Sequence, residues 1–142
     1  MTALRLNHVS VSADDLDVSE RFYTELFGMV RIPAPDFEVP VRWLQVGATQ
    51  LHLFKRAVPA PSNHHFALTV DDFAAVYATA RALDALDRPV VRRLPGGEAQ
   101  AYLRDPAGNL VEINAANADA LDKTIVGELV PVGGDDSARL SL

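Results

Sequence analysis

The sequence of 142 residues contains no cysteine, which excludes disulfide bonds, thiolate metal sites and cysteine nucleophiles. No apolar run approaches the roughly 20 residues that a membrane-spanning helix needs, and the first residues lack the pattern of a signal peptide. The 13 basic residues are outnumbered by 19 acidic ones and form no basic stripe of the kind that binds phosphates. We therefore expect a cytoplasmic protein that binds neither nucleic acid nor a membrane.

An internal repeat organises the chain. Residues 64–72, HHFALTVDD, repeat residues 7–15, NHVSVSADD, at a constant offset of 57. In each copy a histidine opens a run of alternating polar and apolar side chains, which is typical of a half-buried strand. An Asp-Asp pair then ends the run, and aspartate is a favoured cap for the start of a helix. The repeat makes His8 equivalent to His65.

A second pair of equivalent segments lies further along the two copies of the repeat. Residues 110–114, LVEIN, correspond to residues 50–54, QLHLF, at an offset of 60, and loops can absorb the three extra residues. A duplicated unit predicts modules related by a pseudo-twofold axis, in which His52 is equivalent to Glu112. We therefore expect three imidazoles and one carboxylate to converge.

Each copy is expected to form strand, helix, strand, strand, strand, which is an α+β fold within a single domain. The first module covers residues 1–56, the proline-containing linker 57–63, the second module 64–114 and a C-terminal extension 115–142. The predicted strands are 4–12, 29–32, 41–46, 49–55, 64–70, 89–93, 100–104 and 110–114, and the predicted helices are 14–27 and 73–86.

Two short segments carry further predictions. Asp105-Pro106-Ala107-Gly108 fits a type I turn followed by a residue with positive φ. In the extension, Leu121, Ile125 and Leu129 recur at four-residue spacing, which predicts a helix that packs on the outside before the chain frays. A dimer arm or a lid is the alternative for this extension.

The chain resembles the vicinal oxygen chelate superfamily, which includes glyoxalase I, fosfomycin-resistance transferases, bleomycin-binding proteins and extradiol dioxygenases. The resemblance covers residues 4–114, about four-fifths of the chain, and its most specific motifs are LNHVSV (6–11), FYTELFG (22–28) and DPAGNLVEI (105–113). It implies two curled mixed sheets that form one cup, with a divalent metal at its base and a small-molecule substrate. It also implies a homodimer.

The resemblance assigns His8, His65 and Glu112 as metal ligands and places His52 at the fourth ligand position. Glyoxalase I has glutamate or glutamine at this fourth position, so the chain departs from that enzyme there. Imidazoles and a carboxylate suit Fe(II), Ni(II), Co(II), Zn(II) or Mn(II) better than Ca(II) or Mg(II). Four such ligands in octahedral coordination leave two adjacent positions for a substrate with neighbouring oxygens. Glu112 and His52 are then the expected catalytic residues.

Substrate-binding residues are expected among the aromatic and basic side chains of the same strands. Trp43 and Tyr102 are equivalent in the repeat at an offset of 59. The predicted substrate-binding residues are Trp43, Phe54, Tyr102 and Arg104, and Phe37 and Arg92 are further candidates. Ordinary packing or surface solvation is the alternative role for each of them.

Metal-dependent lyase or isomerase chemistry of the glyoxalase type is the function that these features favour. A metal-free protein that sequesters an aromatic antibiotic is the main alternative, against which the aromatic content of 7% and the three histidines argue. A metal-dependent dioxygenase is less favoured, because the chain is shorter than typical extradiol enzymes. A fosfomycin-type transferase would need a cation-binding loop that the sequence does not show.

Overall fold

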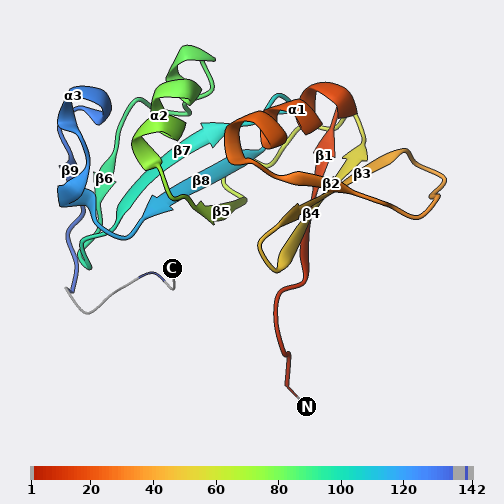
Figure 1. The fold of residues 1–142 in the computed structure, drawn as a ribbon, viewed down its shortest axis with the longest axis horizontal. Helices are drawn as coiled ribbons and strands as arrows, with labels where there is room; N and C mark the ends of the chain where they lie inside the picture. The colour runs from red at the N-terminus through yellow and green to blue at the C-terminus, as the bar shows by residue number, and fades with distance from the viewer. Residues whose placement is uncertain (1, 136–139, 141–142) are drawn as a thin grey trace. The chain divides into compact units, whose positions relative to one another are not determined.

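The computed structural model describes residues 2–135 and residue 140 (Figure 1). These residues form two compact units: Met1–Ser62 with Asp105–Asn109, and Asn63–Arg104 with Leu110–Leu142. Each unit contains one mixed sheet, so the predicted α+β fold is confirmed. Among the residues described, no helix is long and apolar enough to cross a membrane.

The first unit follows the predicted order of elements. Its strands and helix are β1 (His8–Ala13), α1 (Leu16–Phe27), β2 (Val30–Ile32), β3 (Val41–Val46) and β4 (Thr49–Lys55). The strand order is β1-β4-β3-β2, in which β1 runs parallel to β4 and the other neighbours are antiparallel. The strand predicted over 4–12 begins only at His8, and Leu4 and Leu6 before it are exposed.

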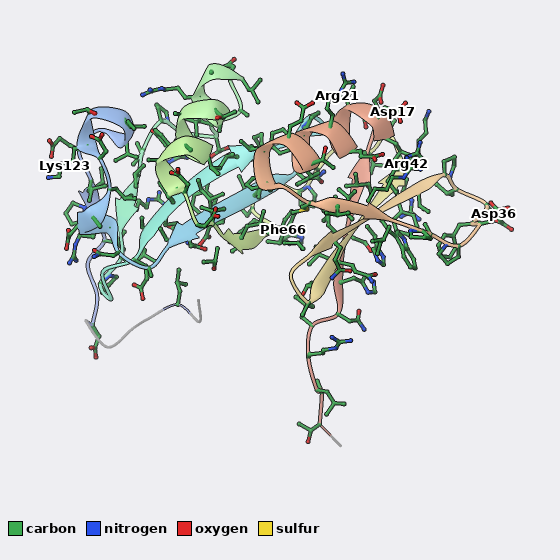
Figure 2. The ribbon with its side chains drawn as sticks, in the orientation of Figure 1. Asp17, Arg21, Asp36, Arg42, Phe66 and Lys123 are labelled. Carbon is green, nitrogen blue, oxygen red and sulfur yellow. The ribbon has the colours of Figure 1, made fainter. Side chains whose placement is uncertain are left out.

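Helix α1 ends at Phe27 as predicted and begins at Leu16, two residues after the predicted start. The Asp15 side chain accepts hydrogen bonds from the amides of Asp17 and Val18, and Gly28 ends the helix in the left-handed conformation at φ 64°. On the solvent side, Arg42 of β3 donates to Asp17 at 3.3 Å and to Glu20 at 3.1 Å. Figure 2 labels Asp17 and Arg42. These ion pairs attach the helix to β3.

The second unit repeats the order and adds one strand. Its elements are β5 (His65–Thr69), α2 (Phe73–Ala82), β6 (Arg92–Arg93), β7 (Ala99–Arg104), β8 (Leu110–Ala115), the 3₁₀ helix η1 (Ala118–Ala120), α3 (Lys123–Val126) and β9 (Val130–Pro131). The strand order is β5-β8-β7-β6-β9. As in the first unit, the first strand is parallel to the last strand of its module.

The strand registers confirm the repeat residue by residue. Ser10 lies opposite His52, and Ala67, its equivalent at an offset of 57, lies opposite Glu112. On the antiparallel side, Trp43 lies opposite His52, just as Tyr102 lies opposite Glu112. The offsets of 57, 59 and 60 read from the sequence are therefore the offsets of the folded strands.

Three predicted elements of the second module are shorter than expected, and one of them, β5, loses only one residue at each end. Helix α2 ends at Ala82 and not at Leu86, because the chain turns at Asp84 with φ 54° and the Ala85 amide donates to Ala80 O at 2.8 Å. The strand predicted over 89–93 is reduced to Arg92–Arg93, because the Val90 amide donates to its near neighbour Arg88 O and bends the chain.

The C-terminal extension does not form the single helix predicted around Leu121, Ile125 and Leu129. Asp122 caps only the short helix α3, and Gly127 at φ 78° ends it. The chain then adds β9, which pairs in parallel with β6, so the described part of the extension completes the sheet of the second unit. Residues 136–139, 141 and 142 lie outside the described residues.

The turn between β7 and β8 forms as predicted and packs within the first unit. Gly108 has φ 83°, and its amide donates to Asp105 O at 2.8 Å. The buried Asp105 side chain accepts hydrogen bonds from the Ala107 and Asn109 amides, from Asn109 Nδ2 and from the hydroxyl of Tyr23 at 2.8 Å. Burial and Asp105 raise the pKa of Tyr23 well above its ordinary value, so its hydroxyl stays a donor.

The hydrogen bond from the Tyr23 hydroxyl to Asp105 leads to a prediction about stability. Tyr23→Phe removes the donor from a buried carboxyl group, and we expect it to lower the free energy of unfolding by about 1.5 to 3 kcal/mol. Urea denaturation measures the change.

Tyr77→Phe is the matched control, because Tyr77 is also a buried helical tyrosine but donates to no acceptor among the described residues. We expect a change below about 0.5 kcal/mol for this control. Equal destabilisation of the two variants would contradict the assigned role of Tyr23.

Candidate functional site

Three aromatic rings lie in a stack across the sheet of the first unit. The His52 ring is nearly parallel to Trp43 of β3, with centroids 4.1 Å apart and planes at 3°, and to His8 of β1, at 4.3 Å and 12°. The strand order β1-β4-β3 places His52 between the other two. Since side chains alternate along a strand, the stack lies on the opposite sheet face from the buried Leu51 and Leu53 of β4.

A pocket of about 400 Å³ adjoins this stack. Its lining residues are Arg5, Asn7, His8, Ser10, Phe37, Trp43, Ala48, Gln50, His52 and Phe54. Phe37, from the loop between β2 and β3, has its ring centroid 6.2 Å from those of both Trp43 and Phe54. The predicted substrate-binding residues Trp43 and Phe54 therefore share one pocket.

His52 is a neutral imidazole at neutral pH. Its residue is 6% exposed, and burial, together with the neighbouring His8, lowers its pKa below the ordinary value. Its Nε2 lies 2.9 Å from Gln50 Oε1, and because the amide oxygen only accepts, Nε2 carries the proton. The lone pair of His52 is therefore on Nδ1.

The second unit holds a histidine and a carboxylate in direct contact. His65 Nδ1 lies 3.0 Å from Asn63 O, to which it donates, and His65 Nε2 lies 3.1 Å from Glu112 Oε2. Two ligand atoms bound at about 2.1 Å and at right angles to each other would be about 3 Å apart. The separation therefore fits two neighbouring ligands of one transition metal, and the Asn63 carbonyl fixes the histidine tautomer that such ligation needs.

Glu112 is 4% exposed and surrounded by donors. Asn114 Nδ2 donates to Glu112 Oε1 at 2.8 Å, and Gln100 and Tyr102 also donate to this carboxylate. Burial acts to raise the pKa of Glu112, but these three hydrogen bonds and the nearby His65 outweigh it, so the pKa is lowered. Glu112 is therefore an anion at neutral pH.

Tyr102 lies on β7, between β8, which carries Glu112, and β6, which carries Arg92. Its ring is edge-on to His65, with centroids 5.4 Å apart, and the Arg92 guanidinium lies 5.8 Å from its ring centroid. Burial and the Glu112 carboxylate raise the pKa of Tyr102 to about 12, so its hydroxyl is protonated. Arg104, also a predicted substrate-binding residue, pairs with Asp87 at 2.8 Å.

The structure thus brings the four predicted ligands together as two pairs, His8 with His52 and His65 with Glu112. Neither unit by itself gathers three or more His, Asp or Glu side chains suited to a metal within its described residues. The first pair differs from the second, because its rings stack face to face.

Gln50 and Asn114 contact predicted ligands but are not among the site residues predicted from the sequence. Each lies two residues from a predicted ligand on the same strand, Gln50 before His52 and Asn114 after Glu112, and bonds to it. The two-residue period of a strand places such neighbours on one face. That spacing was the signal by which both residues could have been found.

Comparisons with known proteins agree with this architecture. The sequence model of the Glyoxalase/Bleomycin resistance protein/Dioxygenase superfamily matches residues 5–113. The uncharacterized protein YwbC of Bacillus subtilis (strain 168) is 30% identical in an alignment of 122 positions that covers 78% of this chain and 96% of that protein.

Solved structures with a similar fold are also found. Lactoylglutathione lyase from Agrobacterium tumefaciens superposes with a TM-score of 0.62 at 25% identity, covering 85% of this chain and 100% of that one. The fosfomycin resistance protein FosX from Listeria monocytogenes has a TM-score of 0.67 at 16% identity, covering 83% and 98%. With the family match over three-quarters of its length and the duplicated strand-helix-strand-strand-strand fold, the chain belongs to the Glyoxalase/Bleomycin resistance protein/Dioxygenase superfamily.

Proposed function

We propose that this protein is a divalent-transition-metal-dependent enzyme of the glyoxalase type, which acts as a homodimer on a small substrate with two neighbouring oxygens in a lyase or isomerase reaction. The observation that carries the proposal is the contact of His65 Nε2 with Glu112 Oε2 at 3.1 Å, on a histidine whose other nitrogen already donates to a backbone carbonyl. Membership in the superfamily supports it.

The proposed ligands are His65 and Glu112 of the second unit with His8 and His52 of the first. The donor set, three imidazoles and one anionic carboxylate, suits Fe(II), Ni(II), Co(II), Zn(II) or Mn(II). When bound, such a metal acts as a Lewis acid that stabilises negative charge on the substrate oxygens. His52 fits the role because its lowered pKa leaves a lone pair on Nδ1.

The protein's own side chains supply proton transfer and substrate orientation. Glu112 and His52 are the proposed proton carriers, and each carries no proton on the atom concerned at neutral pH, Oε2 and Nδ1 respectively. Oε2 of Glu112 keeps a second lone pair when one binds a metal, whereas His52 accepts a proton on Nδ1 only when that nitrogen is not bound to the metal. Trp43 and Phe54 offer an apolar wall in the pocket of about 400 Å³, and the Tyr102 hydroxyl is a donor beside Glu112.

A metal-free binding protein for planar aromatic molecules is the second candidate function. The parallel stack of Trp43, His52 and His8 beside a pocket favours it, because aromatic faces bind flat rings. The His65–Glu112 contact favours the enzyme, since an apolar binding cup has no need of a buried anionic carboxylate.

Metal analysis separates these candidates. We expect protein purified without chelator, or loaded and then desalted, to hold one equivalent of a transition metal, and His65→Ala and Glu112→Gln to lower its metal affinity by at least about 100-fold. Mass-spectrometric metal quantitation and calorimetric titration measure both quantities.

His64→Ala is the matched control, because His64 adjoins His65 in sequence but lies outside the site, and we expect unchanged affinity. A metal-free protein that binds flat aromatic drugs would overturn the proposed function in favour of the second candidate.

Sedimentation of the same sample tests the proposed homodimer. A monomer at micromolar concentration would contradict it.

His52 generates a separate prediction, because it occupies the position where the chain departs from glyoxalase I. If His52 ligates the metal, His52→Ala should weaken metal binding as much as His8→Ala and His65→Ala do. A histidine that only hydrogen-bonds to a ligand would cost about 10- to 100-fold in affinity. We expect the first result, measured by metal titration of the three variants side by side. Parent-like affinity in His52→Ala, with loss in the other two, would remove His52 from the ligand set.

The charge of Glu112 predicts a pH dependence of stability. A carboxyl group whose pKa is lower in the folded chain stabilises that chain at pH values above its unfolded pKa, and the contribution is lost as the pH falls through the folded value. We therefore expect the metal-free parent to be more stable than Glu112→Gln at pH 7, and the difference to shrink as the pH falls below about 4.3. Urea denaturation across this range measures it. A difference that grows on acidification would contradict the assignment.

A further inference from the structure

The pocket of about 400 Å³ in the first unit contains a cluster of three aromatic rings. The Phe37 ring centroid lies 6.2 Å from those of Trp43 and Phe54, with planes tilted at 43° and 46°. Phe37 comes from the loop between β2 and β3 and is 44% exposed, so part of its ring is open to a ligand. These three rings, the aromatic cluster, suit a ligand that itself carries an aromatic ring.

The charged side chains that line this pocket have one sign. Arg5, in the segment before β1, is the one Lys or Arg among the described lining residues, and none of these residues is Asp or Glu. The whole chain has the opposite bias, with 19 acidic and 13 basic residues. A pocket of positive sign on an acidic protein favours an anionic ligand.

The Arg5 guanidinium is available to such a ligand. It forms no ion pair with an acidic side chain within the described part of the chain, whereas Arg31 and Arg42 of the same unit both pair with Glu20, at 3.5 Å and 3.1 Å. A guanidinium presents parallel N–H donors that match the two oxygens of a carboxylate. Arg5 can therefore pair with a carboxylate of the ligand without giving up a partner in the protein.

A second guanidinium decides between an anionic and a cationic ligand. Aromatic faces alone would also attract a cation. The Arg56 guanidinium, however, already lies 5.1 Å from the ring centroid of Phe54, and it too forms no ion pair with an acidic residue that the structure describes. A cationic ligand would be repelled by both Arg5 and Arg56, whereas an anion would be attracted by both.

We propose that this pocket binds an aromatic carboxylate, whose ring packs against the aromatic cluster and whose carboxylate pairs with Arg5. All the residues that carry the proposal belong to the first unit. As a substrate class for the enzyme, the inference rests on the proposed function. Binding through these groups needs no metal, so it can be measured in protein that has been treated with a chelator.

Calorimetric titration of the metal-free parent with three probes tests the proposal. Biphenylcarboxylate has both the rings and the charge, biphenylcarboxamide lacks the charge, and the saturated bicyclohexylcarboxylate lacks the rings. We expect the first to bind at least about 3-fold more tightly than either of the others. Trp43 is the only tryptophan of the chain, so a change in its fluorescence during the titration locates binding at this pocket.

Two variants separate the contributions of charge and ring. Arg5→Gln changes an exposed residue that precedes β1, so this variant should fold normally. We expect it to bind biphenylcarboxylate about 3- to 10-fold more weakly than the parent does and to bind biphenylcarboxamide equally well. Phe37→Leu keeps an apolar side chain but removes the ring, and it should weaken both aromatic probes while leaving the saturated probe unchanged.

Arg21→Gln is the matched control for the charge. Arg21, labelled in Figure 2, is also exposed and has no acidic partner among the residues described, but it lies on α1 and does not line the pocket. All three probes should bind this variant as they bind the parent.

Two results would overturn the proposal: a parent that binds the amide as tightly as the carboxylate, or an Arg5→Gln variant that keeps the full preference for the carboxylate. A parent that shows the expected preference but takes up no transition metal would support the aromatic carboxylate as ligand and refute the proposed function. The two failures are therefore distinguishable.

Discussion

The parallel pairing of the first strand with the last strand of each module is the constraint on which the site depends. β1 pairs with β4 and β5 with β8 in the same register, so that the histidine of the first strand lies diagonally from the candidate ligand of the last. A slip of one residue would move every such side chain to the opposite face of the sheet. The buried apolar residues between them, Leu51 and Leu53 on β4 and Val111 and Ile113 on β8, resist that slip, because it would expose them.

The two modules use the same register for different local chemistry. In the first, His52 stacks between two rings and loses basicity through burial. In the second, Glu112 is buried among amide and hydroxyl donors that keep it ionised. Both arrangements satisfy buried polar groups with amides from the same strand, which is why Gln50 and Asn114 matter as much to the geometry as the residues they hold.

Short sequence motifs correctly predicted the elements whose ends depend on residues adjacent in the chain. Asp15 and Gly28 bound α1, strands β3 and β4 have their expected ends, and the turn at Gly108 has its expected positive φ. The predictions that failed concern segments whose structure depends on pairing with a strand that is distant in the sequence. Leu4 to Asn7 alternate like a strand yet precede β1, and the extension adds β9 to β6, because an unpaired edge strand accepts a partner that no local pattern reveals.

The sequence by itself determined the duplicated fold and the four candidate ligands, because a repeat with offsets of 57, 59 and 60 residues records which strand positions are equivalent. Tertiary structure alone decided what each ligand touches: the ring stack on His52, the contact of His65 with Glu112, and the choice of Asn114 as the partner of Oε1. The physical reason is that alternation specifies the face of a side chain, whereas distance, tautomer and charge depend on the strands that lie beside it.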